Sequence, residues 1–100
     1  MFIALMCFDK PDSLQLRLDT RPAHLEHMKS FEQQGKVAAG GPLLGPDGKP
    51  NGSLIVLDVA DAEEARAFAA ADPYAKAGLF AKVEFREWAW SINPPAPRRA

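Results

Sequence analysis

The chain has 100 residues, of which 47% are hydrophobic and 25% charged, and its formal net charge is −1. This length predicts one domain with a modest core, and the near-neutral charge, with no Lys/Arg run in the part expected to fold, excludes a basic nucleic-acid-binding face. Cys7 is the only cysteine, which excludes an internal disulfide and a cysteine-based metal motif. We therefore expect a reducing, cytoplasmic location.

The first predicted element is a strand over 2–8, where apolar residues run almost without interruption. So short a run is typical of a strand buried on both faces, and Cys7 within it is expected to be a small buried hydrophobe. The run has no positively charged region before it and no cleavage site after it, and it is too short to span a bilayer. We therefore expect neither a signal peptide nor a membrane anchor.

A break is predicted in the helical region that follows. A short piece over 14–18 precedes a main helix over about 21–34, because Pro22 fits the first turn of a helix, where a missing N–H group does no harm. Gly35 then ends the main helix as a C-terminal cap.

The main helix carries both histidines of the chain. His24, Met28 and Phe31 follow i, i+4, i+7 spacing, so His24 is predicted on the inward stripe, with His27 at its margin. His24 and His27 have a spacing that can chelate a metal, but no third ligand stands at a fixed spacing from them. We therefore expect no metal site.

A second strand is predicted over 36–44 and a third over 53–59, joined by a Gly/Pro-rich turn into an antiparallel hairpin. The segment Gly40-Gly41-Pro42 indicates an edge strand, with either a bulge or room for another group to approach the backbone. Asp61 is the expected cap of a second helix over 62–71.

Asp72 follows the buried stripe of the second helix at i+4 from Phe68, so its side chain is predicted to point inward, and Pro73 ends the helix. A short helical piece over 74–79 and a last strand over 80–92 complete the expected domain, 1–92. Residues 93–100 are predicted to be a Pro-rich tail without packing signals.

The order β-α-β-β-α-β predicts an α+β, ferredoxin-like sandwich. In it a four-stranded antiparallel sheet carries both helices on one face, and the second and fourth strands form the edges. Two right-handed crossovers are expected to set the first and third strands side by side in parallel. The other face of the sheet stays apolar, because these two strands show little polar alternation. We therefore expect a homodimer that packs sheet face to sheet face.

His24 and Asp72 are predicted to converge, because each lies where a helix end meets the same sheet face. A histidine oriented by a carboxylate is a usual general-base pair. The alternative is a core histidine bonded to a backbone carbonyl, with Asp72 in an Asp-Pro turn formed for local reasons. Tyr74 either closes a pocket or only packs.

Arg21 lies one turn before His24, at the predicted helix N-terminus. It is either a clamp for a carboxylate-bearing small molecule or an exposed, weakly paired side chain. A Gly-rich phosphate loop and a GxSxG nucleophile elbow are both absent from the sequence, and Cys7 has no base near it. Nucleophilic catalysis is therefore not expected.

Four segments together resemble the YciI-like (YCII-related) family of the dimeric α+β barrel superfamily. They are DKPDSL at 9–14, RPAHL at 21–25, AGGP at 39–42 and ADPY at 71–74 with AGLF at 77–80. The resemblance runs over about 1–92 and implies the dimeric α+β barrel fold. It also implies a catalytic pair and a set of pocket residues, which are His24 and Asp72 for the pair and Arg21, Gly41, Pro42 and Tyr74 for the pocket.

The resemblance further implies a chemistry. Relatives include a dehydrochlorinase acting on a chlorinated hydroxymuconate, and the fold looks like that of muconolactone isomerase. Both remove a proton next to a carbonyl or conjugated acid without a cofactor. We therefore expect a cofactor-free lyase or isomerase in which His24 takes the proton, Asp72 orients the imidazole and Arg21 holds a substrate carboxylate.

Two alternatives stand beside this expectation. One is a non-catalytic small-ligand-binding or accessory protein with the same pocket, and the other is a cofactor-free monooxygenase of the same barrel type, because fold alone does not define function. No cofactor, nucleic acid or membrane partner is expected.

Overall fold

The structure, a computed structural model, describes residues 1–95. The last five residues of the predicted Pro-rich tail, 96–100, lie outside this part. In chain order the elements are β1 (Phe2–Asp9), α1 (Leu14–Gln33), β2 (Val37–Leu44), β3 (Pro50–Asp58), α2 (Ala62–Ala71), α3 (Pro73–Lys76) and β4 (Phe80–Trp88).

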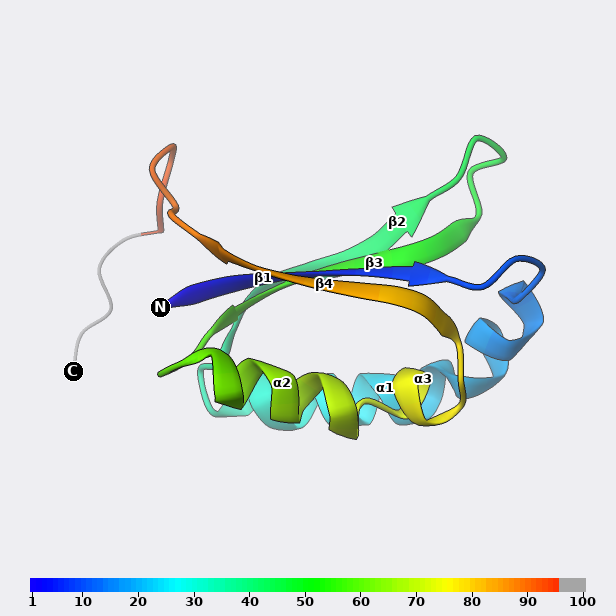
Figure 1. Ribbon diagram of the computed structural model, residues 1–100, viewed down its shortest axis with the longest axis horizontal. Helices are drawn as coiled ribbons and strands as arrows, with labels where there is room; N and C mark the ends of the chain where they lie inside the picture. Colours follow the sequence, from blue (N-terminus) through cyan, green and yellow to red (C-terminus); the bar gives the residue numbers. More distant parts are fainter. Residues whose placement is uncertain (96–100) are drawn as a thin grey trace.

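The four strands form one sheet in the order β2-β3-β1-β4, and the helices cover one of its faces (Figure 1). This confirms the predicted ferredoxin-like sandwich with its second and fourth strands at the edges. The expected parallel pairing of the first and third strands is wrong, because β1 pairs with β3 antiparallel. The crossover through α1 makes β1 and β2 point the same way, and the hairpin then reverses β3 against both.

The predicted break before Pro22 is also wrong, because α1 is one helix of 20 residues with Pro22 inside it. The carbonyl that loses its N–H partner to Pro22 belongs to Leu18, a residue at the exposed surface of the helix. Figure 1 shows the first turns of α1, in blue, lying at an angle to the remainder. Gly35 follows the helix with φ of 72°, as expected of a C-terminal cap.

The edge strand β2 holds the glycine-rich segment in regular register. Gly40, Gly41 and Pro42 pair with Ile55, Leu54 and Ser53, and the irregularities lie instead near the two ends of the strand, between Val37 and Ala39 and between Leu43 and Leu44. A Cβ atom added at Gly41 would meet no heavy atom within 4 Å. Gly41 therefore leaves open space beside the strand, and the glycine-rich segment does not form a bulge.

The core lies between the sheet and the helices. Alternate residues of β1 face it, so Ile3, Leu5 and Cys7 are buried together with Phe68 of α2. Burial raises the pKa of the Cys7 thiol to about 12, and the charge of Asp72 adds to the rise. Cys7 is therefore a neutral buried thiol, as predicted. None of the helices within residues 1–95 is both long enough and apolar enough to cross a membrane.

The C-terminal elements are shorter than predicted. The helical piece ends at Lys76 and the last strand ends at Trp88. Beyond it, the Trp90 Nε1–H group donates to the Ile92 carbonyl at 3.0 Å, and the Trp90 ring packs edge-on against Phe2 at 5.8 Å. Trp90 thus covers the end of the sheet after the ladder has stopped.

Gly52 is the glycine at which the sheet leaves the least space for a side chain. A Cβ atom there would lie 2.6 Å from the backbone oxygen of Cys7, and backbone in the middle of a sheet cannot move aside. We expect Gly52→Ala to lower the free energy of unfolding by about 1–3 kcal/mol. The matched control Gly41→Ala, in open space, is expected to change it by less than about 0.5 kcal/mol. Urea denaturation measures both, and equal midpoints for the two variants would contradict the prediction.

Candidate functional site

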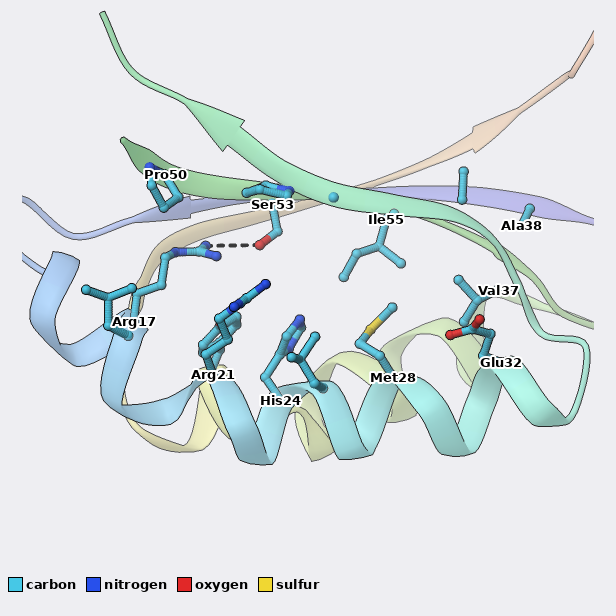
Figure 2. A pocket seen from close by; sticks show the side chains of 17 residues that line it. Arg17, Arg21, His24, Met28, Glu32, Val37, Ala38, Pro50, Ser53 and Ile55 are labelled. Carbon is cyan, nitrogen blue, oxygen red and sulfur yellow. Dashed lines mark hydrogen bonds between the residues drawn. The ribbon is translucent and has the colours of Figure 1, made fainter. Parts of the chain in front are cut away.

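A pocket of about 530 Å³ lies between α1 and the β2–β3 side of the sheet. Figure 2 shows side chains entering it from the helix on one side and from the strands on the other. Among the described residues, 1–95, every residue that lines it belongs to a helix or strand and no loop contributes. The lining residues that carry polar side chains are Arg17, Arg21, His24, Glu32, Ser53 and Tyr74.

The structure brings His24 and Asp72 together although 48 positions separate them in the sequence. His24 Nδ1 lies 2.9 Å from Asp72 Oδ1, within ordinary hydrogen-bonding distance. Asp72 is 2% exposed and does not line the pocket, whereas His24 is 9% exposed and does. The carboxylate therefore stands behind the imidazole, and the imidazole faces the pocket.

Local sequence explains where Asp72 is held. Pro73 forces the preceding residue out of the helical region, and Asp72 has φ −62° and ψ 125° between the end of α2 and the start of α3. Its Oδ1 atom accepts the Tyr74 N–H group at 2.9 Å as a helix cap. The same oxygen accepts from His24, because an ionised carboxylate has no proton to donate.

This arrangement determines which ring nitrogen can act as a base. With the proton on Nδ1, the neutral imidazole carries its lone pair on Nε2. The part of the chain that the structure describes gives His24 Nε2 no hydrogen-bond partner. Nε2 is thus left for a group inside the pocket.

Tyr74 lies against the other side of the same histidine. The two rings are stacked with centroids 4.0 Å apart and planes 16° from parallel, and Tyr74 is 1% exposed. Burial raises the pKa of Tyr74 above its ordinary value, although the charges of Arg17 and Arg21 oppose the rise. Tyr74 is therefore a neutral phenol that lines the pocket and packs His24 in place.

Arg17 is the site residue that sequence reasoning missed. It is buried and forms two hydrogen bonds to Asp9, from Nε at 2.7 Å and from Nη2 at 2.9 Å. Its guanidinium carbon also lies 4.7 Å from the centre of the Tyr74 ring. Burial alone would lower the Arg17 pKa, but hydrogen bonding and the charge of Asp9 outweigh it and raise the pKa above its ordinary value.

A sequence signal for Arg17 does exist. Arg17 and Arg21 extend the stripe of His24, Met28 and Phe31 backward with the same alternation of steps of four and three. The predicted break before Pro22 hid this continuation, because it cut the stripe in two.

The other predicted pocket residues all border the cavity. Arg21, Gly41, Pro42 and Tyr74 line it together with His24. The Arg21 side chain is exposed, and within residues 1–95 no ion pair or hydrogen bond holds it. Figure 2 shows Arg17 and Arg21 at one end of the pocket and Met28 and Glu32 toward the other. One end is therefore cationic and the middle is apolar.

His27 is the core histidine of this helix. Its Nε2 lies 3.0 Å from the Phe68 carbonyl oxygen, and its ring packs 4.7 Å from that of Phe68 and 5.1 Å from that of Phe31. It faces away from His24 and does not line the pocket. Among residues 1–95, no three His, Cys, Asp or Glu side chains cluster closely enough to hold a metal ion.

The fold is that of a ferredoxin-like α+β barrel protein, and a pocket lies on the helical side of its sheet. A family model for the YCII-related domain matches residues 1–89, and the chain belongs to this family, which confirms the resemblance read from the sequence. Protein YciI of Escherichia coli O6:H1 is 33% identical over 92 residues, covering 86% of this chain and 94% of that protein.

A solved structure shares the fold closely. The 5-chloro-2-hydroxyhydroquinone dehydrochlorinase of Burkholderia phenoliruptrix AC1100, in complex with 2,5-dihydroxybenzoquinone, is 33% identical with a TM-score of 0.82, covering 89% of this chain and 94% of that chain. This neighbour is a dehydrochlorinase, as the family resemblance implies. It is named for a chlorinated hydroquinone, however, and not for the chlorinated hydroxymuconate that was expected.

A more distant structure shares only the fold. An antibiotic biosynthesis monooxygenase is 12% identical with a TM-score of 0.51, covering 88% of this chain and 97% of that chain. At this identity the similarity shows the α+β barrel architecture and gives no support to a monooxygenase reaction.

The Arg17–Asp9 pair yields a stability prediction. Both side chains are at most 5% exposed, so Arg17→Met leaves a buried carboxylate without its partner and is expected to cost about 3–5 kcal/mol of unfolding free energy. Combining it with Asp9→Leu removes the stranded charge and is expected to restore most of that loss. Urea denaturation of the two single variants and the double variant completes the cycle, and a double variant as unstable as Arg17→Met would contradict the prediction.

Proposed function

We propose that this protein is a cofactor-free small-molecule enzyme of the lyase or isomerase type, with His24 and Asp72 as its general acid/base pair. The observation that carries the proposal is the 2.9 Å contact between His24 Nδ1 and a buried carboxylate, behind a ring whose other nitrogen faces a pocket. The kinship with a dehydrochlorinase supports it.

The proton step follows from the geometry. His24 Nε2 takes a proton from the substrate, and the electron pair it leaves moves into the conjugated system. Asp72 holds the ring in the required tautomer and stabilises the imidazolium that forms. The stacked Tyr74 ring adds a cation–π contact once His24 is charged. General-base catalysis of this kind contributes roughly 10²- to 10⁴-fold.

Completion of the reaction needs no external redox partner. In a dehydrochlorination the electron pair expels chloride, so that one proton and one chloride leave together. In an isomerisation the imidazolium returns the proton to a different carbon. Arg21, free of protein partners in the described chain and one turn from His24, supplies positive charge for a substrate carboxylate or another anionic oxygen.

The enzyme proposal predicts the behaviour of a His24 variant. Without added cofactor, the wild type is expected to convert 5-chloro-2-hydroxyhydroquinone, a muconolactone or a halogenated hydroxymuconate. His24→Ala is expected to lower kcat by about 10²- to 10⁴-fold, because it removes the base. The matched control is His27→Gln, which changes the histidine outside the pocket and keeps a side chain able to hydrogen-bond to the Phe68 carbonyl. Turnover is followed by absorbance and by chloride release.

The outcome separates the two classes of function. If His24→Ala converts substrate at the wild-type rate, the general-base role of His24 is refuted. Binding of these compounds without turnover in either protein would favour the non-catalytic ligand-binding alternative.

We further infer that two copies of the chain associate through the sheet face opposite the helices. Phe8, Leu54 and Trp88 on that face are each about 40% exposed, and the face is bordered by the charged β4 residues Lys82, Glu84 and Arg86. Exposed apolar surface of this kind marks an association site. The dimeric α+β barrel fold of the family supports a second copy as the occupant.

The dimer proposal predicts a mass. Size-exclusion chromatography with light scattering is expected to give about twice the 10.9 kDa of one chain at micromolar concentration. Leu54→Asp, which sets a charge in the middle of this face, is expected to give the single-chain mass. A wild-type protein that elutes as a clean monomer would refute the dimer.

A further inference from the structure

The Ser53 side chain stands at the cationic end of the pocket, and its hydroxyl accepts a hydrogen bond but donates none within the described residues. Ser53 is 4% exposed, lies on β3 and lines the pocket. Its Oγ atom accepts a hydrogen bond from Arg17 Nη2 at 3.0 Å, and Figure 2 shows the two side chains meeting between the strand and the helix. A hydroxyl that accepts one bond still has a hydrogen to donate.

Arg17 determines how that hydroxyl is oriented. The Nη2 group carries two hydrogens, and the structure gives both of them an acceptor, Asp9 Oδ1 at 2.9 Å and Ser53 Oγ at 3.0 Å. The second contact to Asp9, from Nε, fixes the plane of the guanidinium. One lone pair of Ser53 Oγ is therefore occupied from the Arg17 side, and its O–H bond must point elsewhere.

The structure gives that O–H group no acceptor among residues 1–95. A buried donor without an acceptor is costly, and the open space beside Ser53 is the pocket. The exposed Arg21 side chain reaches the same end of the pocket from the helix (Figure 2). Two hydrogen-bond donors thus face the same end of the pocket. One is the neutral Ser53 hydroxyl, which Arg17 holds in place, and the other is the charged Arg21 guanidinium.

We propose that Ser53, positioned by Arg17 and assisted by Arg21, forms a subsite for the anionic oxygen of a conjugated ring ligand of the hydroxyquinone or cyclic enolate class. This deepens the proposed function and depends on it. His24 lies two helical turns, about 10 Å, from Arg17 and about one turn from Arg21. A six-membered ring whose oxygen meets Ser53 therefore extends toward His24.

The far part of the pocket favours a compact ligand whose charge stays near the Ser53 end. Beyond His24 the lining is apolar, with Met28, Val37 and Ile55, and Glu32 stands at the opposite end. The carboxylate of Glu32 opposes a second negative charge at that end. A compact ring that lies between Ser53 and His24 keeps its charge away from Glu32, and it therefore fits this distribution better than an extended dicarboxylate does.

The subsite also assigns a place for the charge that develops in the reaction. When His24 takes a proton, negative charge gathers on the conjugated oxygen, and the Ser53 hydroxyl donates to that oxygen. The charge leaves the oxygen again when chloride departs or the proton returns. Donors fixed before the reaction stabilise such charge without reorganising.

Binding of two quinones to purified protein tests the proposal. The probes are 2,5-dihydroxybenzoquinone, which loses the protons of both hydroxyl groups in neutral solution, and 2,5-dimethoxybenzoquinone, which does not ionise. Calorimetric titration is expected to show that Ser53→Ala weakens binding of the dihydroxy compound by about 10- to 100-fold and that of the dimethoxy compound by clearly less, because hydrogen bonds to charged groups are the stronger. Ser53→Cys keeps the volume with a poor donor and is expected to act like Ser53→Ala. Ser30→Ala, at an exposed position of α1 outside the pocket, is the control.

Each other outcome overturns the subsite. No binding of the dihydroxy compound to the wild type rejects the ligand class, unchanged affinity in Ser53→Ala rejects the donor, and equal losses for both probes assign Ser53 a packing role. Failure of the proposed function is seen separately. His24→Ala tests turnover, whereas the quinone titrations report only binding at the Ser53 end of the pocket.

Discussion

One carboxylate oxygen, Oδ1 of Asp72, accepts hydrogen bonds from both the Tyr74 N–H group and the His24 imidazole, each at 2.9 Å. The first bond caps α3 just after α2 has ended. The second ties that junction to α1, 48 positions earlier in the chain. Because the carboxylate is buried, it needs both donors to offset the loss of its hydration. The same contact therefore contributes to the packing of three helices and fixes the tautomer of the pocket histidine.

From this junction a continuous set of contacts runs to the first strand. The His24 ring stacks on Tyr74, the Arg17 guanidinium lies over the same phenol, and Asp9 at the end of β1 holds Arg17. Each of these side chains is buried and in contact with the next, so the Tyr74 ring separates the Arg17–Asp9 ion pair from the His24–Asp72 hydrogen bond. Ser53 is joined to the set through Arg17. The cationic end of the pocket and the proposed base, His24, are thus parts of one packed unit.

Sequence periodicity was sufficient to predict that the side chains of His24 and Asp72 converge, because each lies on a regular apolar stripe and the element order sets both helices on one sheet face. Arg17 was missed for a local reason. Proline in a helix interior usually breaks the helix, but here α1 continues through Pro22, and the residue four positions before it, Leu18, lies at the surface. The two histidines show a further limit. The alternative of a core histidine bonded to a backbone carbonyl describes His27, and only tertiary contacts distinguish it from His24. The direction of β1 relative to β3 depends on how the crossover and the hairpin combine. The secondary-structure propensity of the residues does not indicate this direction.

Among the described residues, the wall of the pocket contains no loop residue, and this affects how a ligand would bind. The Cα positions of Arg17, Arg21 and His24 are set by the rise of one helix, and Ser53 and Ile55 are set by the register of paired strands. The spacing between the cationic end of the pocket and the proposed base, His24, therefore depends on backbone hydrogen bonding. A ligand that enters does not have to order a segment of chain, so little conformational entropy is lost on binding. Selectivity then comes from the shape and charge of a cavity that is already formed in the free protein.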